Sequence, residues 1–242
     1  MRSLSGPRRA AALRAVVLVG AVVLALFGFA VLAPRPVRSS NLLSELPRTR
    51  IAVVSDSYTS GTVLGGYLPA TRWPALAWQQ LAEQGIPVDG DVAAEGRAGY
   101  ATRGDHGDMF GDLMRRAVKP DDSEVVFFGS RNDVDIDLGV LAATVQEDLA
   151  WAQHAAPAAR LLIIGPPWPA PKPPQWVLAI RDVLRERAAE VDGTFIDPIA
   201  EKWFIDRRDL IGQDGIHPTD TGHAYLAAKI APLIKAQLPG WI

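Results

Sequence analysis

The sequence of 242 residues contains no cysteine. This absence excludes disulfide bonds, thiolate zinc sites, a cysteine nucleophile and a lipid-modified cysteine behind an export signal. It leaves the compartment open, because an exported protein can fold without disulfides. An excess of charge is also missing, since the formal net charge is −2 and the pI is near 6.1. Nucleic-acid-binding domains usually show a basic face, so we expect no nucleic-acid partner.

Several common motifs of catalytic, metal, nucleotide and cofactor sites are absent as well. The chain has no H-E-x-x-H, G-x-S-x-G, P-loop or dinucleotide fingerprint. "DVDIDLG", residues 133–139, spaces its aspartates like the start of an EF-hand, but the sixth and twelfth positions are Leu138 and Thr144 instead of Gly and Glu. His106 and His154 have no partner at metal-ligand spacing. The sequence therefore predicts neither a metal site nor a cofactor.

The N-terminus combines a basic segment with a long apolar run. Residues 1–14 contain four arginines, and residues 15–33 carry no charge over 19 positions. At about 1.5 Å per residue, such a helix would span roughly 28 Å, close to the hydrocarbon thickness of a bilayer. Basic residues ahead of the run favour a cytoplasmic N-terminus. We expect residues 15–33 to be an uncleaved signal anchor in the cell membrane, with the rest of the chain outside.

The alternative is a cleaved signal peptide and a secreted protein. Val31-Leu32-Ala33 is a tolerable cleavage site, although Pro34 directly after it is unfavourable. Residues 34–49, with three prolines and three arginines, are predicted to be a linker.

Residues 50–242 are predicted to form one domain in which strands and helices alternate. Expected strands cover residues 51–54, 88–94, 124–128, 161–164 and 194–196, and expected helices cover 74–84, 109–118, 139–155, 177–191 and 221–237. The strands are apolar on both faces, which is typical of a parallel sheet covered by helices on both sides. The fold class is therefore α/β, a three-layer α/β/α sandwich with a mostly parallel sheet.

Polar clusters follow the predicted strands. They are "SDSYTSG", "EGRAGYAT", "GSRNDVD" and "GPPWPAP", and "DGIHPTDTGH" lies just before the last helix. The carboxyl ends of parallel strands meet at one edge of a sheet, where ligands bind. The sequence thus predicts a site at this edge.

Asp214 and His217 are the pair in these clusters with the clearest chemistry. An aspartate beside a histidine holds the imidazole in one tautomer, as a general base for serine requires. Alone, a D-x-x-H pair is equally compatible with a surface loop. His223, six residues further on, is expected to have a structural role in the last helix, with contact to the site as the alternative.

The remaining clusters offer a nucleophile and oxyanion donors. Ser57 is one of three serines in "SDSYTSG", and each serine is either a turn residue or a nucleophile. Asn132 follows the third strand and offers an amide donor, or is a turn asparagine. Gly99 leaves its backbone N–H accessible, or is an ordinary turn glycine. Arg131 and Asp133 are expected to form an ion pair or to be solvated.

In order, S-D-S, Gly99, N-D and D-x-x-H-P resemble the four blocks of the SGNH, or GDSL-type, serine hydrolases, an esterase and lipase family. The resemblance extends from about residue 50 to residue 237. It implies an α/β/α fold of flavodoxin-like topology. It also implies that Ser57 is the nucleophile, that His217 is the base and that Asp214 orients the base.

By the same resemblance, Gly99, Asn132 and the Ser57 amide form the oxyanion hole. One residue departs from the family pattern, since Ser55 stands where the family has glycine. A glycine there usually permits backbone angles or close packing that a Cβ hinders. Serine is the next smallest choice, so we expect a tolerated variation that affects the geometry of this loop.

The expected function is an exported serine esterase that forms an acyl-enzyme. Its substrates would be O-acyl groups of envelope carbohydrates, or lipid and short acyl esters. The chain would also associate with the membrane through residues 15–33, and its oligomeric state is left open. Two alternatives stay open, an acyltransferase with the same triad and a non-catalytic glycan- or lipid-binding module. Trp168 and Trp176 either wall the pocket for the acyl group or sugar, or belong to the core.

Overall fold

The computed structural model describes residues 48–61 and 69–238. Within these ranges, no helix is long and apolar enough to cross a membrane. The predicted basic segment, residues 1–14, and the predicted signal anchor, residues 15–33, lie outside the described residues. Most of the predicted linker, residues 34–49, lies outside them too.

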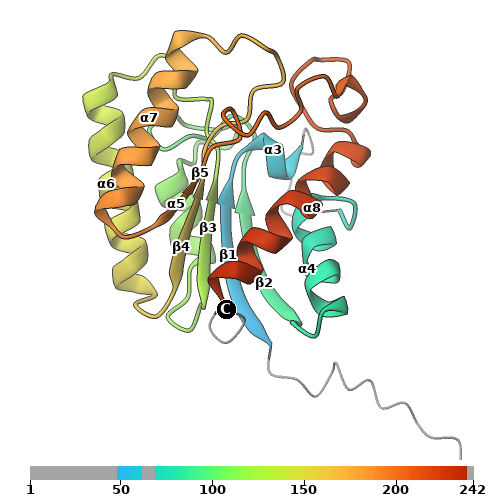
Figure 1. The fold of residues 1–242 in the computed structure, drawn as a ribbon. Coiled ribbons are helices and arrows are strands. Elements are labelled where there is room, and N and C mark those ends of the chain that lie inside the picture. The colour runs from blue at the N-terminus through green and yellow to red at the C-terminus, as the bar shows by residue number, and fades with distance from the viewer. Residues whose placement is uncertain (1–47, 62–68, 239–242) are drawn as a thin grey trace, which may run out of the picture. The chain divides into compact units, whose positions relative to one another are not determined.

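The described chain builds a five-stranded sheet in which every pair of neighbours is parallel. Its strands are β1 (Thr49–Ser55), β2 (Val88–Ala94), β3 (Glu124–Phe128), β4 (Arg160–Ile164) and β5 (Thr194–Ile196). Their order across the sheet is β2-β1-β3-β4-β5 (Figure 1). This is the flavodoxin-like order of doubly wound sheets, which confirms the predicted fold class.

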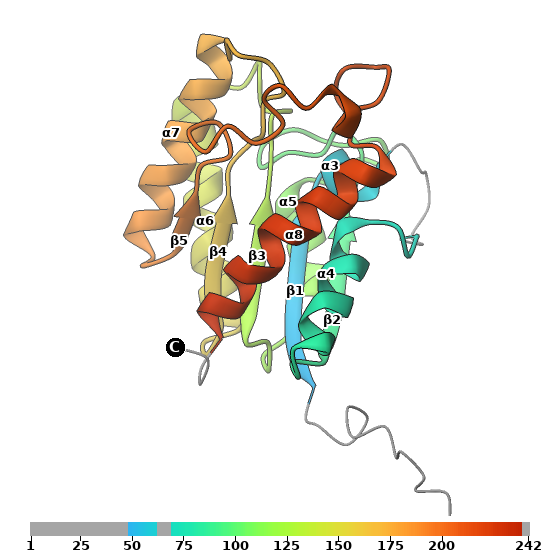
Figure 2. The same ribbon diagram turned by 45° about the vertical axis from the view of Figure 1, so that its right-hand side comes forward.

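Helices cover both faces of this sheet (Figures 1 and 2). They are α3 (Ser57–Ser60), α4 (Trp73–Glu83), α5 (Phe110–Ala117), α6 (Leu138–Ala155), α7 (Gln175–Glu190) and α8 (Asp220–Gln237), with a 3-10 helix, η1 (Arg208–Leu210). Alternate residues of a strand point to opposite faces. In β1, Ile51 and Val53 belong to the core beneath α4 and α8, whereas Ala52 and Val54 belong to the core beneath α5, α6 and α7.

The elements predicted from hydrophobic patterning agree with the structure to within two residues at each end. β1 begins at Thr49, two residues before the predicted start of this strand. The short helices α3 and η1 were not predicted, because four and three residues are too few to show a helical period.

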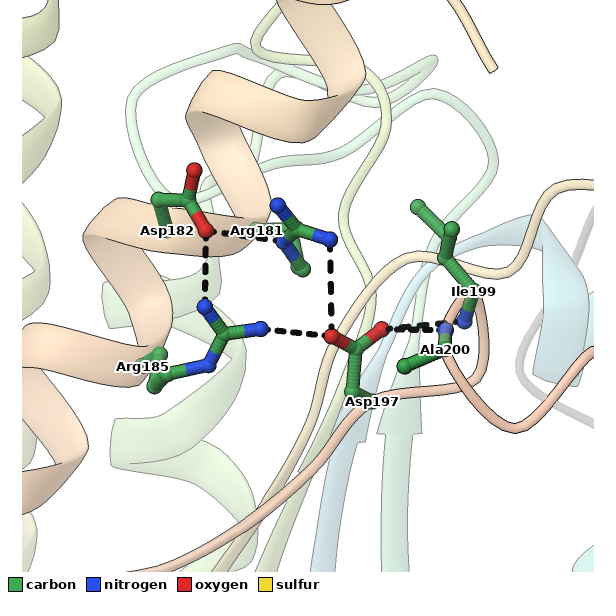
Figure 3. A network of polar contacts seen from close by, with 6 residues as sticks. All are labelled: Arg181, Asp182, Arg185, Asp197, Ile199 and Ala200. Atoms are coloured by element: carbon green, nitrogen blue, oxygen red, sulfur yellow. Dashed lines mark hydrogen bonds and ion pairs between the residues drawn. The ribbon is translucent and has the colours of Figure 1, made fainter. Parts of the chain in front are cut away.

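The segment after β5 is fastened to α7 by a polar network (Figure 3). Asp197 accepts hydrogen bonds from the backbone N–H groups of Ile199 and Ala200, at 3.0 and 2.9 Å. Its other carboxylate oxygen pairs with Arg185 at 2.5 Å and with Arg181 at 3.5 Å. This network fixes the start of the chain segment that leads to Asp214 and His217.

Candidate active site

Ser57 begins α3, the short helix at the carboxyl end of β1 (Figure 1). Asp56 caps this helix, since its Oδ1 accepts a hydrogen bond from the Tyr58 N–H at 2.8 Å. Asp56 is 1% exposed, and burial raises the pKa of its carboxyl to about 7. Ser57 itself is half-buried. The cap therefore fixes the backbone conformation that places the Ser57 hydroxyl at the carboxyl end of β1.

Ser55, the departure from the family pattern, is the last residue of β1 and has an ordinary negative φ. Its Oγ donates to the Phe128 carbonyl of β3 at 2.8 Å and accepts from Thr59 Oγ1 at 2.7 Å. Trp73 Nε1 in turn donates to Thr59 Oγ1 at 2.7 Å. The serine hydroxyl is thus fully used in a buried chain of hydrogen bonds, and the position needs no glycine conformation.

Asp214 and His217 are in direct contact, with 2.6 Å between Asp214 Oδ2 and His217 Nδ1. Asp214 Oδ1 also accepts from the N–H groups of Ile216 and His217, at 2.9 and 3.0 Å. The His217 hydrogen bond, followed by that from Ile216, lowers the pKa of the Asp214 carboxyl to about 2. An ionised carboxylate only accepts, so Nδ1 carries the proton and Nε2 is left as an acceptor.

A tight hairpin ahead of α8 brings these two side chains together. Gly212 N–H donates to the His217 carbonyl at 2.8 Å, and Thr219 N–H donates to the Leu210 carbonyl at 2.9 Å. Thr219 also caps α8 by accepting from Gly222 N–H at 3.1 Å. A Cβ at Gly222 would collide with the Leu210 carbonyl, so this glycine lets the helix approach the hairpin closely.

Ser57 and His217 line one pocket of about 570 Å³, a size typical of ligand sites. The described residues that line it are Ser57, Gly61, Gly96, Arg97, Asp105, His106 and His217. Within the described ranges, Ser57 and His217 share no hydrogen bond. Contacts of this kind are often loose without substrate and tighten in the complex.

The predicted oxyanion donors, Asn132 and Gly99, do not line this pocket. Asn132 Nδ2 donates to the Ala98 carbonyl at 2.9 Å, which leaves one of its two N–H bonds available. The Gly99 N–H donates to the Thr102 carbonyl at 2.9 Å and is therefore engaged. A Cβ at Gly99 would lie 2.5 Å from Asp133 Oδ1, so the glycine is needed for packing.

Asp133 ties the loop that contains Gly99 to the end of β3. It is 1% exposed, and its carboxylate accepts from the N–H groups of Tyr100 and Ala101, at 3.1 and 2.9 Å. The prediction that Arg131 and Asp133 form an ion pair or are solvated is therefore wrong for Asp133. Sequence gave no sign of this role, because it depends on how a distant loop folds back.

Arg131 instead lies over Trp168, with its guanidinium carbon 4.4 Å from the ring centroid. Trp168 packs edge-on against Trp176 at 5.5 Å between centroids. Neither tryptophan lines the pocket described above. The cluster joins the loop after β3 to the loop after β4 beside Asn132.

His223 is fully buried in α8, and neither ring nitrogen has a hydrogen-bond partner among the described residues. Burial lowers the pKa of its imidazole to about 4, and the nearby Arg72 acts in the same direction. The ring is therefore neutral at pH 7, as the expected structural role requires.

No group of three or more His, Asp or Glu residues in the described part of the chain is arranged to hold a metal ion. Asp137 of the EF-hand-like run caps α6, accepting from Gly139 and Val140 N–H at 2.9 and 3.1 Å.

The sheet order and the polar groups at its carboxyl edge define a class, the flavodoxin-like α/β proteins with a site at the carboxyl ends of the strands. Residues 56–225 match the model of the GDSL-like Lipase/Acylhydrolase family. The chain belongs to this family and is a carboxylic ester hydrolase, which confirms the resemblance predicted from the four sequence blocks.

The chain is 54% identical over 193 residues to a protein named GDSL lipase Rv0518 from Mycobacterium tuberculosis (strain ATCC 25618 / H37Rv), with 78% of this chain and 83% of that protein covered. Among solved structures, TesA is 20% identical with a TM-score of 0.62, over 78% of this chain and 100% of its own. The lipase/acylhydrolase from Enterococcus faecalis is 22% identical with a TM-score of 0.58, over 78% and 97%. Both structures share the fold.

Proposed function

We propose that the protein is an exported serine esterase in which Ser57 is the nucleophile, His217 the general base and Asp214 the residue that orients it. One observation carries this assignment. Asp214 holds Nδ1 of His217, so Nε2 is the nitrogen of that ring left to accept a proton, and His217 lines the same pocket as Ser57.

In this mechanism, Ser57 Oγ attacks the acyl carbonyl while His217 Nε2 takes its proton. The imidazolium then gives that proton to the departing alcohol as the C–O bond breaks, and an acyl-serine remains. Water repeats the sequence and releases the acid. Asp214 stays ionised throughout, since its pKa is about 2, and it stabilises the imidazolium.

The charge that develops on the carbonyl oxygen needs donors. Asn132 offers the Nδ2 hydrogen that Ala98 does not use. Gly99 would contribute only by exchanging the Thr102 carbonyl for the oxyanion. The Ser57 amide is the third proposed donor.

Two features support the proposed substrates and location. The relative with 54% identity is named a lipase, which agrees with an ester of an acyl group as substrate. The apolar run of residues 15–33 would place the enzyme outside the cell membrane, facing O-acylated envelope carbohydrates and lipid esters.

A fluorophosphonate probe tests the nucleophile, since it labels activated serines covalently. We expect the wild type to be labelled and to hydrolyse short aryl esters, and Ser57→Ala to lose both activities. Ser60→Ala is the matched control, because Ser60 lies three residues away and, among the described residues, its Oγ hydrogen-bonds only to the neighbouring Gly61 carbonyl, at 3.2 Å.

Labelling of Ser57→Ala at the wild-type rate would show that Ser57 is not the nucleophile. A wild-type protein that is not labelled and hydrolyses no ester would contradict the proposed esterase function. A reduced rate in Asp214→Asn, with labelling still dependent on Ser57, would agree with the orienting role.

A further inference from the structure

The loop after β2 supplies most of the pocket wall beside Ser57 and His217. Gly96, Arg97 and Asp105 belong to this loop, as does His106. Among the described residues that line the pocket, no side chain is aliphatic. These side chains bring polar groups into the wall beside Ser57 and His217.

Arg97 and Asp105 form an ion pair within this wall. Arg97 Nε donates to Asp105 Oδ1 at 2.5 Å, and Arg97 Nη2 pairs with the same oxygen. The Arg97 side chain is 78% exposed even though it is paired. Its backbone has a φ of +63°, a conformation that non-glycine residues seldom adopt and that occurs often at functional sites.

The loop holds this pair in place by contacts of its own. Asp105 N–H donates to the Gly96 carbonyl at 2.9 Å, and His106 N–H donates to Glu95 Oε1 at 2.5 Å. Glu95 is 5% exposed. A Cβ at Gly96 would collide with the Asp105 carboxylate, and one at Gly104 with the Glu95 carboxylate. These contacts hold Arg97 and Asp105 in the wall through groups of the loop itself.

The pair leaves hydrogen-bonding capacity unused. Among the described residues, Asp105 Oδ2, Arg97 Nη1 and the His106 ring have no hydrogen-bond partner. These groups comprise an acceptor, a donor and a ring that supplies either. A sugar hydroxyl both donates and accepts, so neighbouring hydroxyls match such a wall. An alkyl chain matches none of them and would strip them of water at a cost.

We propose that Arg97 and Asp105 determine the specificity of the pocket by binding the hydroxyl groups of an acylated carbohydrate, with His106 as a third contact. The proposal rests on the proposed function, since it assumes that the acyl carbonyl lies at Ser57. It selects among the proposed substrates, because the alcohol that leaves is a sugar and the site favours it over a hydrocarbon alcohol.

Two matched esters test this selection in the full-length protein. Monoacetylated methyl pyranosides and cyclohexylmethyl acetate share the acetyl group and a six-membered ring, but only the sugars have hydroxyls. We expect the wild type to prefer a sugar acetate. Arg97→Ala and Asp105→Ala should each lower kcat/KM for it about tenfold, mainly through KM, with cyclohexylmethyl acetate and fluorophosphonate labelling within about twofold of wild type.

The double variant should lose no more than the worse single variant, because the two residues act as a pair. Arg103→Ala is the matched control. It removes the same charge from the same loop, but Arg103 is 66% exposed and does not line the pocket, so both esters should be unaffected. Asp105→Asn keeps the size of the side chain and should show the same selective loss if the loop stays folded.

Equal losses on both esters would show a structural role for the pair and overturn the proposal. Wild-type turnover without preference for any sugar acetate would also overturn it, even with Ser57 labelled. Failure of the proposed function has a different signature, since wild-type Ser57 would then resist labelling altogether.

Discussion

Ser55 shows how a single residue is accommodated next to the site. Its hydroxyl joins Thr59 to the Phe128 carbonyl inside the protein, where water cannot replace a lost partner. A buried donor left without an acceptor costs about 1–3 kcal/mol. The residue that departs from the family pattern has therefore become part of the stability of β1 and α3.

Ser55→Gly, which restores the family residue, should destabilise the protein by about 1–3 kcal/mol, because Thr59 loses its acceptor and glycine adds freedom to the unfolded chain. Urea unfolding measures the change. Ser60→Ala should cost less, because within the described part of the chain its hydroxyl bonds only to the adjacent Gly61 carbonyl. If Ser55→Gly were as stable as the wild type, the hydrogen-bond chain would have no energetic role.

Sequence reasoning went furthest for residues whose partners lie in the same short segment. Asp214 and His217 were paired from their spacing, and the structure places them in contact. Asp133 was not recognised, because its partners Tyr100 and Ala101 belong to a loop that meets β3 only in the folded chain. Arg97 was not recognised either, because the path of its own loop, which brings Asp105 back to it, has no periodic pattern. The roles of Ser57, Gly99 and Asn132 stay predictions.

At the scale of elements, hydrophobic runs predicted every strand and each long helix, since burial on one or both faces determines their pattern. Helix α3 was not predicted, because it is stabilised by the capping residue Asp56 and is too short to show a helical hydrophobic pattern. The path of the connection from β5 to α8 could not be predicted from the sequence either. Its path depends on the ion pairs of Asp197 with α7.

Asp197→Ala should destabilise the protein by about 1–3 kcal/mol, since Asp197 is 12% exposed and its loss unpairs two backbone N–H groups and weakens the hold on Arg181 and Arg185. Asp182→Ala is the control. Asp182 contacts the same arginines but is 47% exposed, so its loss should cost less than about 1 kcal/mol. Equal effects in thermal or urea unfolding would contradict the anchoring role of Asp197.

The stability of the folded protein should decrease in acid because of His223. Burial lowers the pKa of its imidazole in the folded state to about 4, below the value of 6.5 expected when unfolded. The unfolded chain therefore binds a proton first as the pH falls. The contribution of His223 is complete above pH 6.5 and is lost as the pH falls through about 4, by an amount on the order of 3 kcal/mol.

Asp56 and Asp148 affect the pH dependence of stability in the opposite direction, because burial raises the pKa of each carboxyl to about 7 and the folded state then binds protons first as the pH falls. The difference between wild type and His223→Leu isolates the histidine. We expect the variant to keep its stability between pH 6.5 and 4 better than wild type in urea unfolding, with His154→Leu, an exposed position, matching wild type. Parallel profiles for wild type and His223→Leu would refute the assignment.

The N-terminal run has a separate test. We expect the full chain to sediment with membranes, and a chain that begins at Pro34 to remain soluble and still be labelled by fluorophosphonate. Soluble native protein that begins near Pro34 would show a cleaved signal instead of an anchor.

The hydrogen-bond chain from Trp73 through Thr59 and Ser55 to Phe128 also constrains how this sequence can vary. A serine at position 55 has its oxygen saturated only if a hydroxyl at 59 donates to it, and that hydroxyl is held by the indole at 73. In relatives with glycine at 55, the other two positions lose this reason to be kept. The three residues are therefore expected to change together during evolution, as one inherited unit.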